Sequence, residues 1–194
     1  SVELARRAAS WTGRELTREQ AGLLEEYAAW LRTEAIPAGG LGPREGERIW
    51  SRHLGDSLLF AVGWPEDSPT EILDVGTGVG LPGIPLSILW PRTRVTLLDR
   101  GGRRVRLLYR AVRVLGLPNV IIAQGDAFAV ADEWAGMVAR GALRAPEMVG
   151  LSARLLSPGG RAVLGLSRQA TPPERTRDLI GVAEALGLEA ELAE

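Results

Sequence analysis

Residues 72–83 restrict the possible folds of this chain more than any other segment. A short apolar run ends at Asp74 and Val75, and glycines then recur at positions 76, 78, 80 and 83. A turn of this kind needs glycine because its backbone takes dihedrals that other residues avoid and leaves room for close approach. Pro82 suits the first turn of a helix, where a missing N–H costs nothing. The segment therefore predicts a strand, a tight turn and a helix, the unit that opens many parallel sheets.

The rest of the chain from residue 71 repeats this rhythm. Short apolar runs at 71–75, 94–98, 119–123, 136–139 and 161–166 predict strands. Helical patterns fall at 82–89, 103–115, 146–155 and 173–186, and 157–160 reads as a tight turn into the fifth strand. Residues 188–192 are expected to start one more strand. The alternation predicts an α/β fold of the Rossmann-like kind, with a mainly parallel sheet flanked by helices.

The N-terminal third has a different, helical pattern. Thr17 and Gln20 form a capping-box pair, and the helix that follows should end near Ala35. Glycine and proline make 38–43 a loop, after which a second helix carries Ile49, Trp50 and His53 on one side. We expect one domain over 1–194, made of a helical N-terminal extension (1–68) and an α/β core (69–194).

Composition excludes several classes of function. The chain has no cysteine and a single histidine, so disulfides, thiolate metal sites and multi-histidine metal sites are all excluded. No apolar stretch is long enough to span a bilayer, and no signal-peptide core follows the first charges. These features predict a cytoplasmic protein with no metal and no membrane partner.

The charge balance is close to neutral, but its chemistry is unusual. The net charge is −1, and every basic side chain is arginine. A near-neutral total is not typical of nucleic-acid binders. The guanidinium fork nevertheless suits phosphates and guanine edges. Compositional bias is the simpler explanation of the absence of lysine. Whether the arginines bind nucleic acid therefore has to be judged from their local placement.

Three aspartates follow successive strands of the predicted sheet. Asp74 closes the first, Asp99 the second at the offset expected for an acid that binds ribose hydroxyls, and Asp126 the third. The match of 78–83 to the GxGxxG pattern is weak alone and gains weight from this context. In one alternative the glycines only make the turn and the aspartates only cap helices. A second alternative is a nicotinamide-dependent oxidoreductase, and titration with NAD would distinguish it from the other functions.

The Asp-x-Gly-x-Gly-x-Gly form and the third acid resemble the S-adenosylmethionine (SAM) class. That resemblance implies that the first turn holds the amino-acid end of SAM, that Asp99 binds its ribose, and that residues after the third strand bind its adenine. The residues it assigns are Asp74, Gly76, Thr77, Gly78, Gly80, Leu81, Asp99, Asp126, Ala127 and Phe128.

Longer stretches of the chain resemble the GidB/RsmG family. The best parts are residues 74–86, 95–99 and 103–108, and the Leu81-Pro82-Gly83 sequence is more specific than the turn itself. Residues 50–57 are similar to the family's Arg-His-x-x-Asp-Ser segment, and Ala139-Arg140 to its fourth-strand Ala-Arg. The resemblance implies a class I SAM-dependent methyltransferase that modifies guanine N7 in 16S small-subunit ribosomal RNA. Its partner would be that RNA or the small ribosomal subunit, and we expect a monomer.

The chain also departs from the family pattern. Residues 36–43 lack the Asn-Leu-Thr of many members, and Gly165-Leu166-Ser167-Arg168 replaces the usual Lys-Gly. A final strand pair is expected beyond the fifth strand. Two alternatives therefore stay open, namely a SAM enzyme acting on a small molecule or protein, and a non-catalytic SAM-fold module that associates with the ribosome.

Arg140 and His53 are the candidate catalytic residues. Arg140 would orient the SAM carboxylate, a phosphate or the guanine O6 edge, unless it only pairs with a carboxylate at the sheet edge. Spacing alone favours a core role for His53, whereas the resemblance places it with Arg52, Asp56 and Ser57 over the cofactor. Arg52 and Asp56 at i,i+4 also fit a plain surface ion pair. Guanine N7 carries a free lone pair, so the reaction needs no general base.

One predicted helix carries a stripe of arginines. Arg103, Arg106, Arg110 and Arg113 share one face, and Arg100 and Arg104 lie nearby. The opposite face would pack on the sheet through Val105, Leu108, Val112 and Leu115. The stripe is either a solvated face or an RNA contact. Trp30 and Trp50 match apolar stripes, which favours core packing over base stacking.

Overall fold

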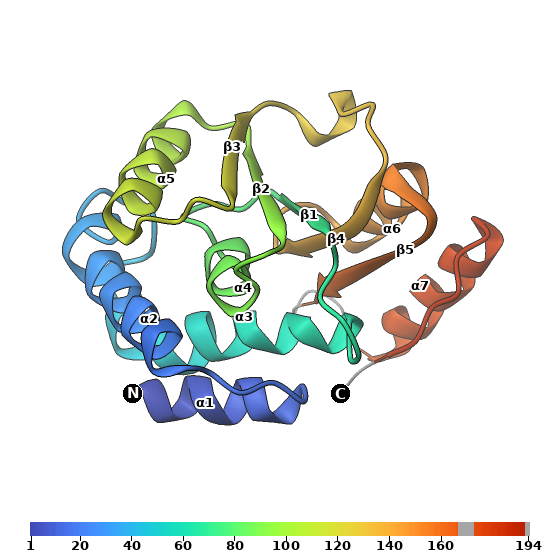
Figure 1. Cartoon of the computed structure of the whole chain (residues 1–194). Coiled ribbons are helices and arrows are strands. Elements are labelled where there is room, and N and C mark those ends of the chain that lie inside the picture. Colours follow the sequence, from blue (N-terminus) through green and yellow to red (C-terminus); the bar gives the residue numbers. More distant parts are fainter. Residues whose placement is uncertain (167–172, 193–194) are drawn as a thin grey trace.

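A five-stranded, all-parallel sheet forms the centre of the computed structural model, which describes residues 1–166 and 173–192 (Figure 1). The strand order is β3-β2-β1-β4-β5. The chain adds β2 and β3 on one side of β1 and then β4 and β5 on the other, so the order of the strands reverses at β1. The five strands span β1 Glu71–Val75, β2 Arg94–Asp99, β3 Val120–Gln124, β4 Trp134–Arg140 and β5 Leu156–Gly165. The predicted fold class is confirmed, and the reversal at β1 is the place where open α/β sheets bind ligands.

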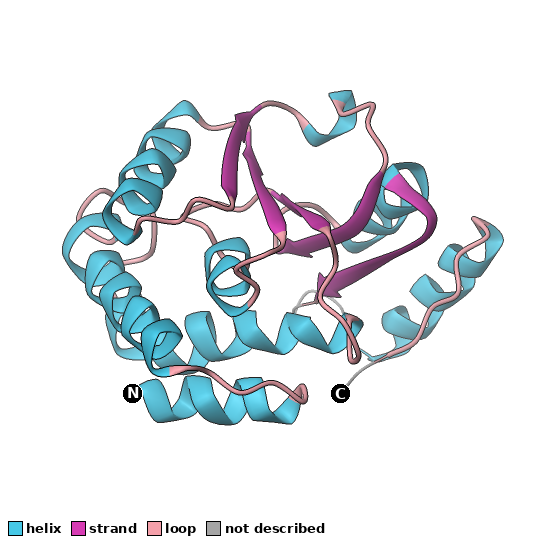
Figure 2. Ribbon diagram, viewed as in Figure 1, coloured by secondary structure: helices cyan, strands magenta, loops and turns pink. Residues whose placement is uncertain are grey.

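Alternate residues of β1 pack into two different cores. Ile72 joins the cluster formed with the N-terminal helices, whereas Leu73 and Val75 join a second cluster on the other face. Both faces are covered because the helices divide between them (Figure 2). Helices α4 Gly83–Leu89 and α5 Gly102–Leu115 cover the first face, and α6 Ala145–Leu155 covers the second, with α7 Pro173–Ala185 against α6.

The N-terminal extension packs on the α4 and α5 side of the sheet. Helix α1 Val2–Trp11 lies on later helical segments, and the pattern analysis did not predict it. Helix α2 Arg18–Trp30 has the predicted capping box, with reciprocal bonds between Thr17 and Gln20, and continues as the π-helical turn η1 Leu31–Ala35. Trp30 is buried in the core and Trp50 packs partly buried against it, so the predicted packing roles are confirmed.

The second predicted N-terminal helix is four short helical pieces instead of one. They are the 3-10 turn η2 Glu45–Arg48, the π-helix η3 Ile49–Gly55, α3 Asp56–Leu59 and the 3-10 turn η4 Phe60–Gly63. A π-helix widens the backbone spiral and changes which side chains share a face. The segment that carries His53 therefore differs from the regular helix that the spacing predicted.

Two predictions near the C-terminal end are wrong. Residues 157–160 lie inside β5, where the register with β4 shifts between Trp134 and Gly136, instead of forming a turn before the strand. Residues 188–192 form no strand. Leu188 packs beside the α6–α7 cluster and Leu192 is half exposed, so this segment lacks the alternating burial that a paired strand needs. Ser167 and Arg168 lie outside the described residues.

Candidate functional site

The glycine turn between β1 and α4 is closed by one carboxylate. Oδ2 of Asp74 accepts hydrogen bonds from Oγ1 of Thr77 at 2.6 Å and from the N–H of Gly83 at 2.7 Å. The φ angles of Gly76, Gly78 and Gly80 are 65°, 66° and 105°, which side chains disfavour. Asp74 therefore ties the beginning of the turn to its end, and the Leu81–Pro82 peptide bond within it is cis.

The second oxygen of Asp74 is an open acceptor. The residue is fully buried, and its Oδ1 has no hydrogen-bond partner among the residues that the structure describes. Burial raises the pKa of Asp74 to about 6, and the nearby Asp99 adds to the rise. An unpaired buried acceptor costs stability unless a ligand meets it, so this atom marks a place for a hydrogen-bond donor.

Tyr27 of α2 stabilises the glycine turn through a hydrogen bond. Its hydroxyl donates to the carbonyl of Val79 at 2.9 Å, and its ring is fully buried. Burial raises the pKa of this hydroxyl well above its ordinary value, so Tyr27 remains a donor. This contact could not be predicted from the sequence, because helical spacing shows only that Tyr27 faces the core.

Asp99 lies where β2 ends, beside the glycine turn. Its oxygens accept from the N–H groups of Gly78 at 3.1 Å and Gly101 at 2.7 Å, and from Nε of Arg104 at 2.9 Å. Burial alone would raise its pKa, but the bonds from Arg104 and the backbone lower the pKa below its ordinary value. A carboxylate offers about four acceptor positions. Arg104 belongs to this pair and not to the free arginine stripe.

The third acid behaves as a cap. Oδ1 of Asp126 accepts from the N–H of Phe128 at 2.9 Å and begins the 3-10 turn η5 Ala127–Ala129. The ring of Phe128 is 53% exposed. Asp126 thus caps this turn through one of its oxygens, while Phe128 presents an open aromatic face near the end of β3.

Arg140 ends β4 and reaches back to the N-terminal extension. Its Nη1 donates to the carbonyl of Arg52 at 3.1 Å. Burial lowers its pKa, while the charges of Asp74 and Asp56 oppose this change. In the described part of the chain Arg140 forms no ion pair within 4 Å, so the plain pairing at the sheet edge is not what holds it.

The segment from Arg52 to Ser57 is brought to Arg140. Burial raises the pKa of Asp56, and the positive charges of Arg140 and Arg52 oppose the rise. The expected Arg52–Asp56 ion pair is absent from the described residues, since the π-helix alters their spacing. Ser57 is fully buried and its hydroxyl donates to the His53 carbonyl, so its contact is internal to the helix.

His53 is held by a residue that the sequence analysis missed. Its Nε2 lies 2.8 Å from Oε2 of Glu45, eight positions earlier in η2. The histidine is 7% exposed and Glu45 is half-buried. Spacing could not reveal this pair, because it depends on the chain path through two non-α turns.

The residues present fit SAM at this edge of the sheet. Asp74 leaves one acceptor open, and a Cβ placed at Gly78 would meet nothing within 4 Å, so the turn has space on that side. By contrast, a Cβ at Gly83 would lie 2.6 Å from Oδ2 of Asp74, which explains the glycine there. The open acceptor of Asp74, the accessible glycine backbone and a second carboxylate at the next strand are the polar groups that a nucleotide-type ligand needs.

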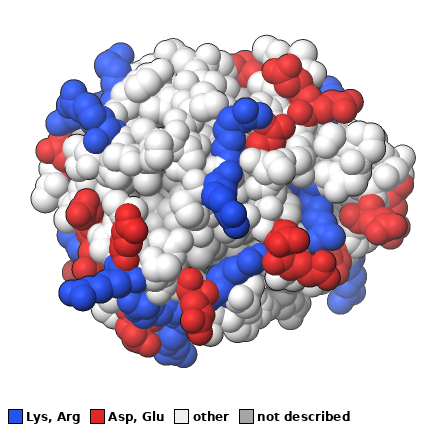
Figure 3. Space-filling model, viewed as in Figure 1, with Lys and Arg blue, Asp and Glu red and all other residues white. Residues whose placement is uncertain are grey.

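The predicted arginine stripe is exposed on α5. Val105, Leu108 and Leu115 are buried on its inner face, whereas Arg103, Arg106, Arg110 and Arg113 are exposed. Figure 3 shows basic side chains gathered over this helix at the upper left of the view. Arg110 bonds to the carboxylate of Glu34, so its charge is partly compensated.

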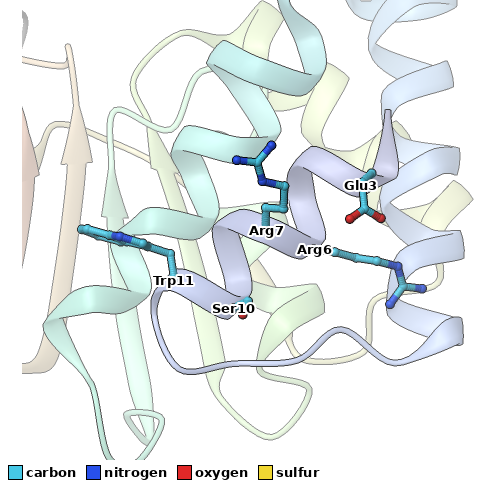
Figure 4. Close-up of a pocket in the computed structure, with 5 residues that line it drawn as sticks. All are labelled: Glu3, Arg6, Arg7, Ser10 and Trp11. Carbon is cyan, nitrogen blue, oxygen red and sulfur yellow. The ribbon is translucent and has the colours of Figure 1, made fainter.

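A surface hollow lies apart from this edge of the sheet. It lies on α1 between Glu3, Arg6, Arg7, Ser10 and Trp11 (Figure 4), and there Arg6 donates to the carbonyl of Leu16 at 2.9 Å. Within residues 1–166 and 173–192 no cluster of three or more acidic or histidine side chains is arranged to hold a metal. No helix in the same ranges has the length and apolar character needed to cross a membrane.

Comparisons with known proteins point to one family. The family described as GidB, rRNA small subunit methyltransferase G, matches residues 20–171. "Ribosomal RNA small subunit methyltransferase G" of Rubrobacter xylanophilus is 35% identical over 95% of this chain and 72% of its own length. Its counterpart in Acidothermus cellulolyticus is 36% identical over 71% of this chain, and the match spans 61% of that relative.

A solved structure supports the fold. The precorrin-6y C5,15-methyltransferase of Geobacter metallireducens superposes with a TM-score of 0.55 at 18% identity, covering 70% of this chain and 74% of its own. At this identity the likeness concerns the architecture, which is that of a class I methyltransferase.

Proposed function

Because the chain belongs to the GidB family of small-subunit ribosomal RNA methyltransferases, we propose that it transfers a methyl group from SAM to N7 of a guanine in 16S ribosomal RNA. The observation that supports this most is the junction of two parts. The glycine turn closed by Asp74 and the arginine Arg140 meet at one edge of the sheet, next to the Arg52–Ser57 segment that resembles the family. We propose that 1–68 and 69–194 act as one methyltransferase domain.

The turn and the acids after β2 and β3 hold the donor in this proposal. SAM supplies an activated methyl group on a sulfonium, so the protein contributes alignment and exclusion of water. Asp74, Gly76, Thr77, Gly78, Gly80 and Leu81 surround its amino-acid end. An ammonium beside the open Oδ1 of Asp74 favours the ionised carboxylate, which offsets the effect of burial on its pKa. Asp99 binds the ribose, and Asp126, Ala127 and Phe128 bind the adenine.

The acceptor is bound on the Arg140 side. Guanine N7 needs no deprotonation, so the residues there orient the base and exclude water. Arg140 is partly buried and tethered to the carbonyl of Arg52, which fixes its guanidinium for contact with a guanine O6 edge or a phosphate. Arg52, His53, Asp56 and Ser57 form the wall that closes the site.

RNA outside the site is bound by α5 in this proposal. Arg103 and Arg106 are exposed and form no ion pair among the described residues. Arginines on one helix face suit a phosphate backbone, and such binding weakens as salt rises. The partner is small-subunit ribosomal RNA or the assembled small subunit, and we propose a monomeric enzyme.

Methyl transfer to defined RNA tests the proposal. The purified chain is incubated with labelled SAM and either small ribosomal subunits or naked 16S RNA, and the modified nucleoside is identified after digestion. We expect label in 7-methylguanosine, and the comparison of the two substrates shows which form is recognised. SAM binding without label would favour a small-molecule enzyme or a non-catalytic module, and NAD binding without SAM binding would favour an oxidoreductase.

A further inference from the structure

His53 and Glu45 form a buried pair beside the proposed methyl-acceptor site. His53 lies in η3, Glu45 begins η2, and their side chains meet with Nε2 of the ring 2.8 Å from Oε2 of the carboxylate. The side chain of His53 is 9% exposed and that of Glu45 26%. His53 is thus the more buried member of the pair and Glu45 the more exposed.

The contact with Glu45 fixes which ring nitrogen carries the proton. The bond to His53 lowers the pKa of Glu45, although burial opposes the change, so Glu45 is an ionised carboxylate that can only accept. Nε2 of His53 must therefore be the donor. In a neutral ring the proton sits on one nitrogen only, and Nδ1 is left with a free lone pair.

The ring is neutral because of its surroundings. Burial lowers the pKa of His53, and the positive charges of Arg140 and Arg52 lower it further, while Glu45 opposes them. Asp56 lies in the same charged group, since the charges of His53, Arg52 and Arg140 all act on its pKa.

Nδ1 of His53 is buried and has no partner among the described residues. An acceptor left unpaired in the interior costs stability, and such atoms at a site commonly await a ligand donor. The carbonyl of Arg52, one residue before His53, accepts the bond from Arg140. The positive charge of Arg140 also acts on the His53 ring, so His53 lies near the arginine that the proposed function places at the methyl acceptor.

The charges nearby select the kind of donor. Arg140 and Arg52 repel a cationic donor, so an ammonium group is disfavoured next to Nδ1. A neutral N–H group does not suffer this repulsion. A guanine carries such groups at N1 and at its exocyclic amine, on the side of the ring away from N7.

We propose that Nδ1 of His53 accepts a hydrogen bond from a neutral N–H group of the base to be methylated, and that Glu45 is the positioning residue that keeps His53 in the Nε2–H form. The inference rests on the proposed function for the identity of the base. The protonation state of the His53 ring can be measured without any turnover. The inference about the ring can therefore fail while the proposed function stands, and the reverse.

The single histidine makes the first test direct. Nitrogen NMR of the 15N-histidine-labelled chain reports one imidazole, and we expect a protonated Nε2 and an unprotonated Nδ1 at neutral pH. Glu45→Gln should mix the two neutral forms, because an amide can accept from or donate to Nε2, and should lower the pKa of His53 further. Glu47→Gln, an exposed change in the same turn, should leave the spectrum as in the wild type. A protonated Nδ1 in the wild type would overturn the proposal.

Kinetics test the ligand. We expect Glu45→Gln to raise the KM for 16S RNA about twofold, because a mixture of the two neutral forms leaves only about half of the molecules with a free Nδ1, and the KM for SAM should stay unchanged. His53→Ala should raise it at least as much, and His53→Asn, which keeps an acceptor near Nδ1, should recover part of the loss. Circular dichroism confirms folding of each variant. An unchanged KM for RNA, or a rise only in the KM for SAM, would show that Nδ1 does not bind the base.

Discussion

The two sides of the site are built in different ways. On the SAM side, residues 74–83 form one continuous turn, and Asp74, Thr77 and Gly83 hold it together through bonds within that turn. On the acceptor side, Arg140 and the pair of Glu45 and His53 come from separate elements and are joined by single contacts. The first side is a local structure of the chain, whereas the second exists only when the N-terminal extension docks on the sheet.

The two sides should therefore respond differently to substitutions. A turn closed by several bonds of one carboxylate depends on that carboxylate. A surface assembled from distant pieces loses its geometry when any one contact is removed, while the fold around it remains. We therefore expect changes on the SAM side to affect stability and SAM binding, and changes on the acceptor side to affect RNA binding and turnover.

The largest effect should come from Asp74 and pH. Its pKa of about 6 in the folded chain lies above the value in an unfolded chain, so the native state binds a proton more tightly. Its contribution to the free energy of unfolding is thus full below about pH 4 and falls by about 3 kcal/mol as pH rises through about 6. Asp74→Asn should remove this fall. Denaturant unfolding between pH 4 and 7 measures it.

The difference between variant and wild type isolates Asp74. His53 contributes with the opposite sign, because its pKa is lowered by burial in the folded chain and this makes stability rise with pH. Asp67→Asn, a change at an exposed residue, serves as the control. If the Asp74→Asn and wild-type curves stay parallel, the buried carboxylate of Asp74 is not the source of this pH dependence.

Arg140 should give the next largest effect. Arg140→Ala removes a partly buried cation and its bond to the Arg52 carbonyl, and we expect kcat/KM for RNA to fall about 100-fold. Arg140→Lys keeps the charge but not the planar fork, and should lose about tenfold. The exposed change Arg113→Ala is the control. Full activity of the lysine variant would mean that charge alone matters on this side.

The arginine stripe on α5 should give a moderate effect. Changing both Arg103 and Arg106 to alanine should weaken RNA binding about tenfold at low salt and reduce the salt slope by about 1.4 for two single-strand phosphate contacts. Arg110→Ala should do less, because Glu34 already pairs with Arg110. Filter binding over a salt series measures both quantities. An unchanged slope in the double variant would make the stripe an ordinary solvated surface.

Tyr27 should give the smallest effect. Tyr27→Phe leaves the carbonyl of Val79 without its donor, which costs about 1 kcal/mol, or about fivefold in SAM affinity. Tyr109→Phe, at a residue that is 58% exposed, is the matched control. Calorimetric titration of SAM compares them. Equal affinities for both variants would show that the turn keeps its shape without support from α2.

The sequence predicted the SAM side better than the acceptor side, for a physical reason. The strand, the glycine turn and Asp99 follow from local periodicity and spacing, so the order of elements and the main parallel sheet were correct. Glu45 and Tyr27 were missed because their partners lie in other elements. The helical pieces from Glu45 to Gly63 were read as one helix, since burial patterns do not reveal a π-helix. Helix α1 was missed too, and the strand expected at 188–192 is absent.

One kinetic comparison tests whether the two sides of the site act separately, one in binding SAM and the other in binding RNA. Steady-state rates are measured for Tyr27→Phe and Glu45→Gln while SAM and 16S RNA are each varied. We expect Tyr27→Phe to raise the KM for SAM alone and Glu45→Gln to raise the KM for RNA alone. If both variants raise the same constant, the site is one coupled unit and the division drawn between its two sides is wrong.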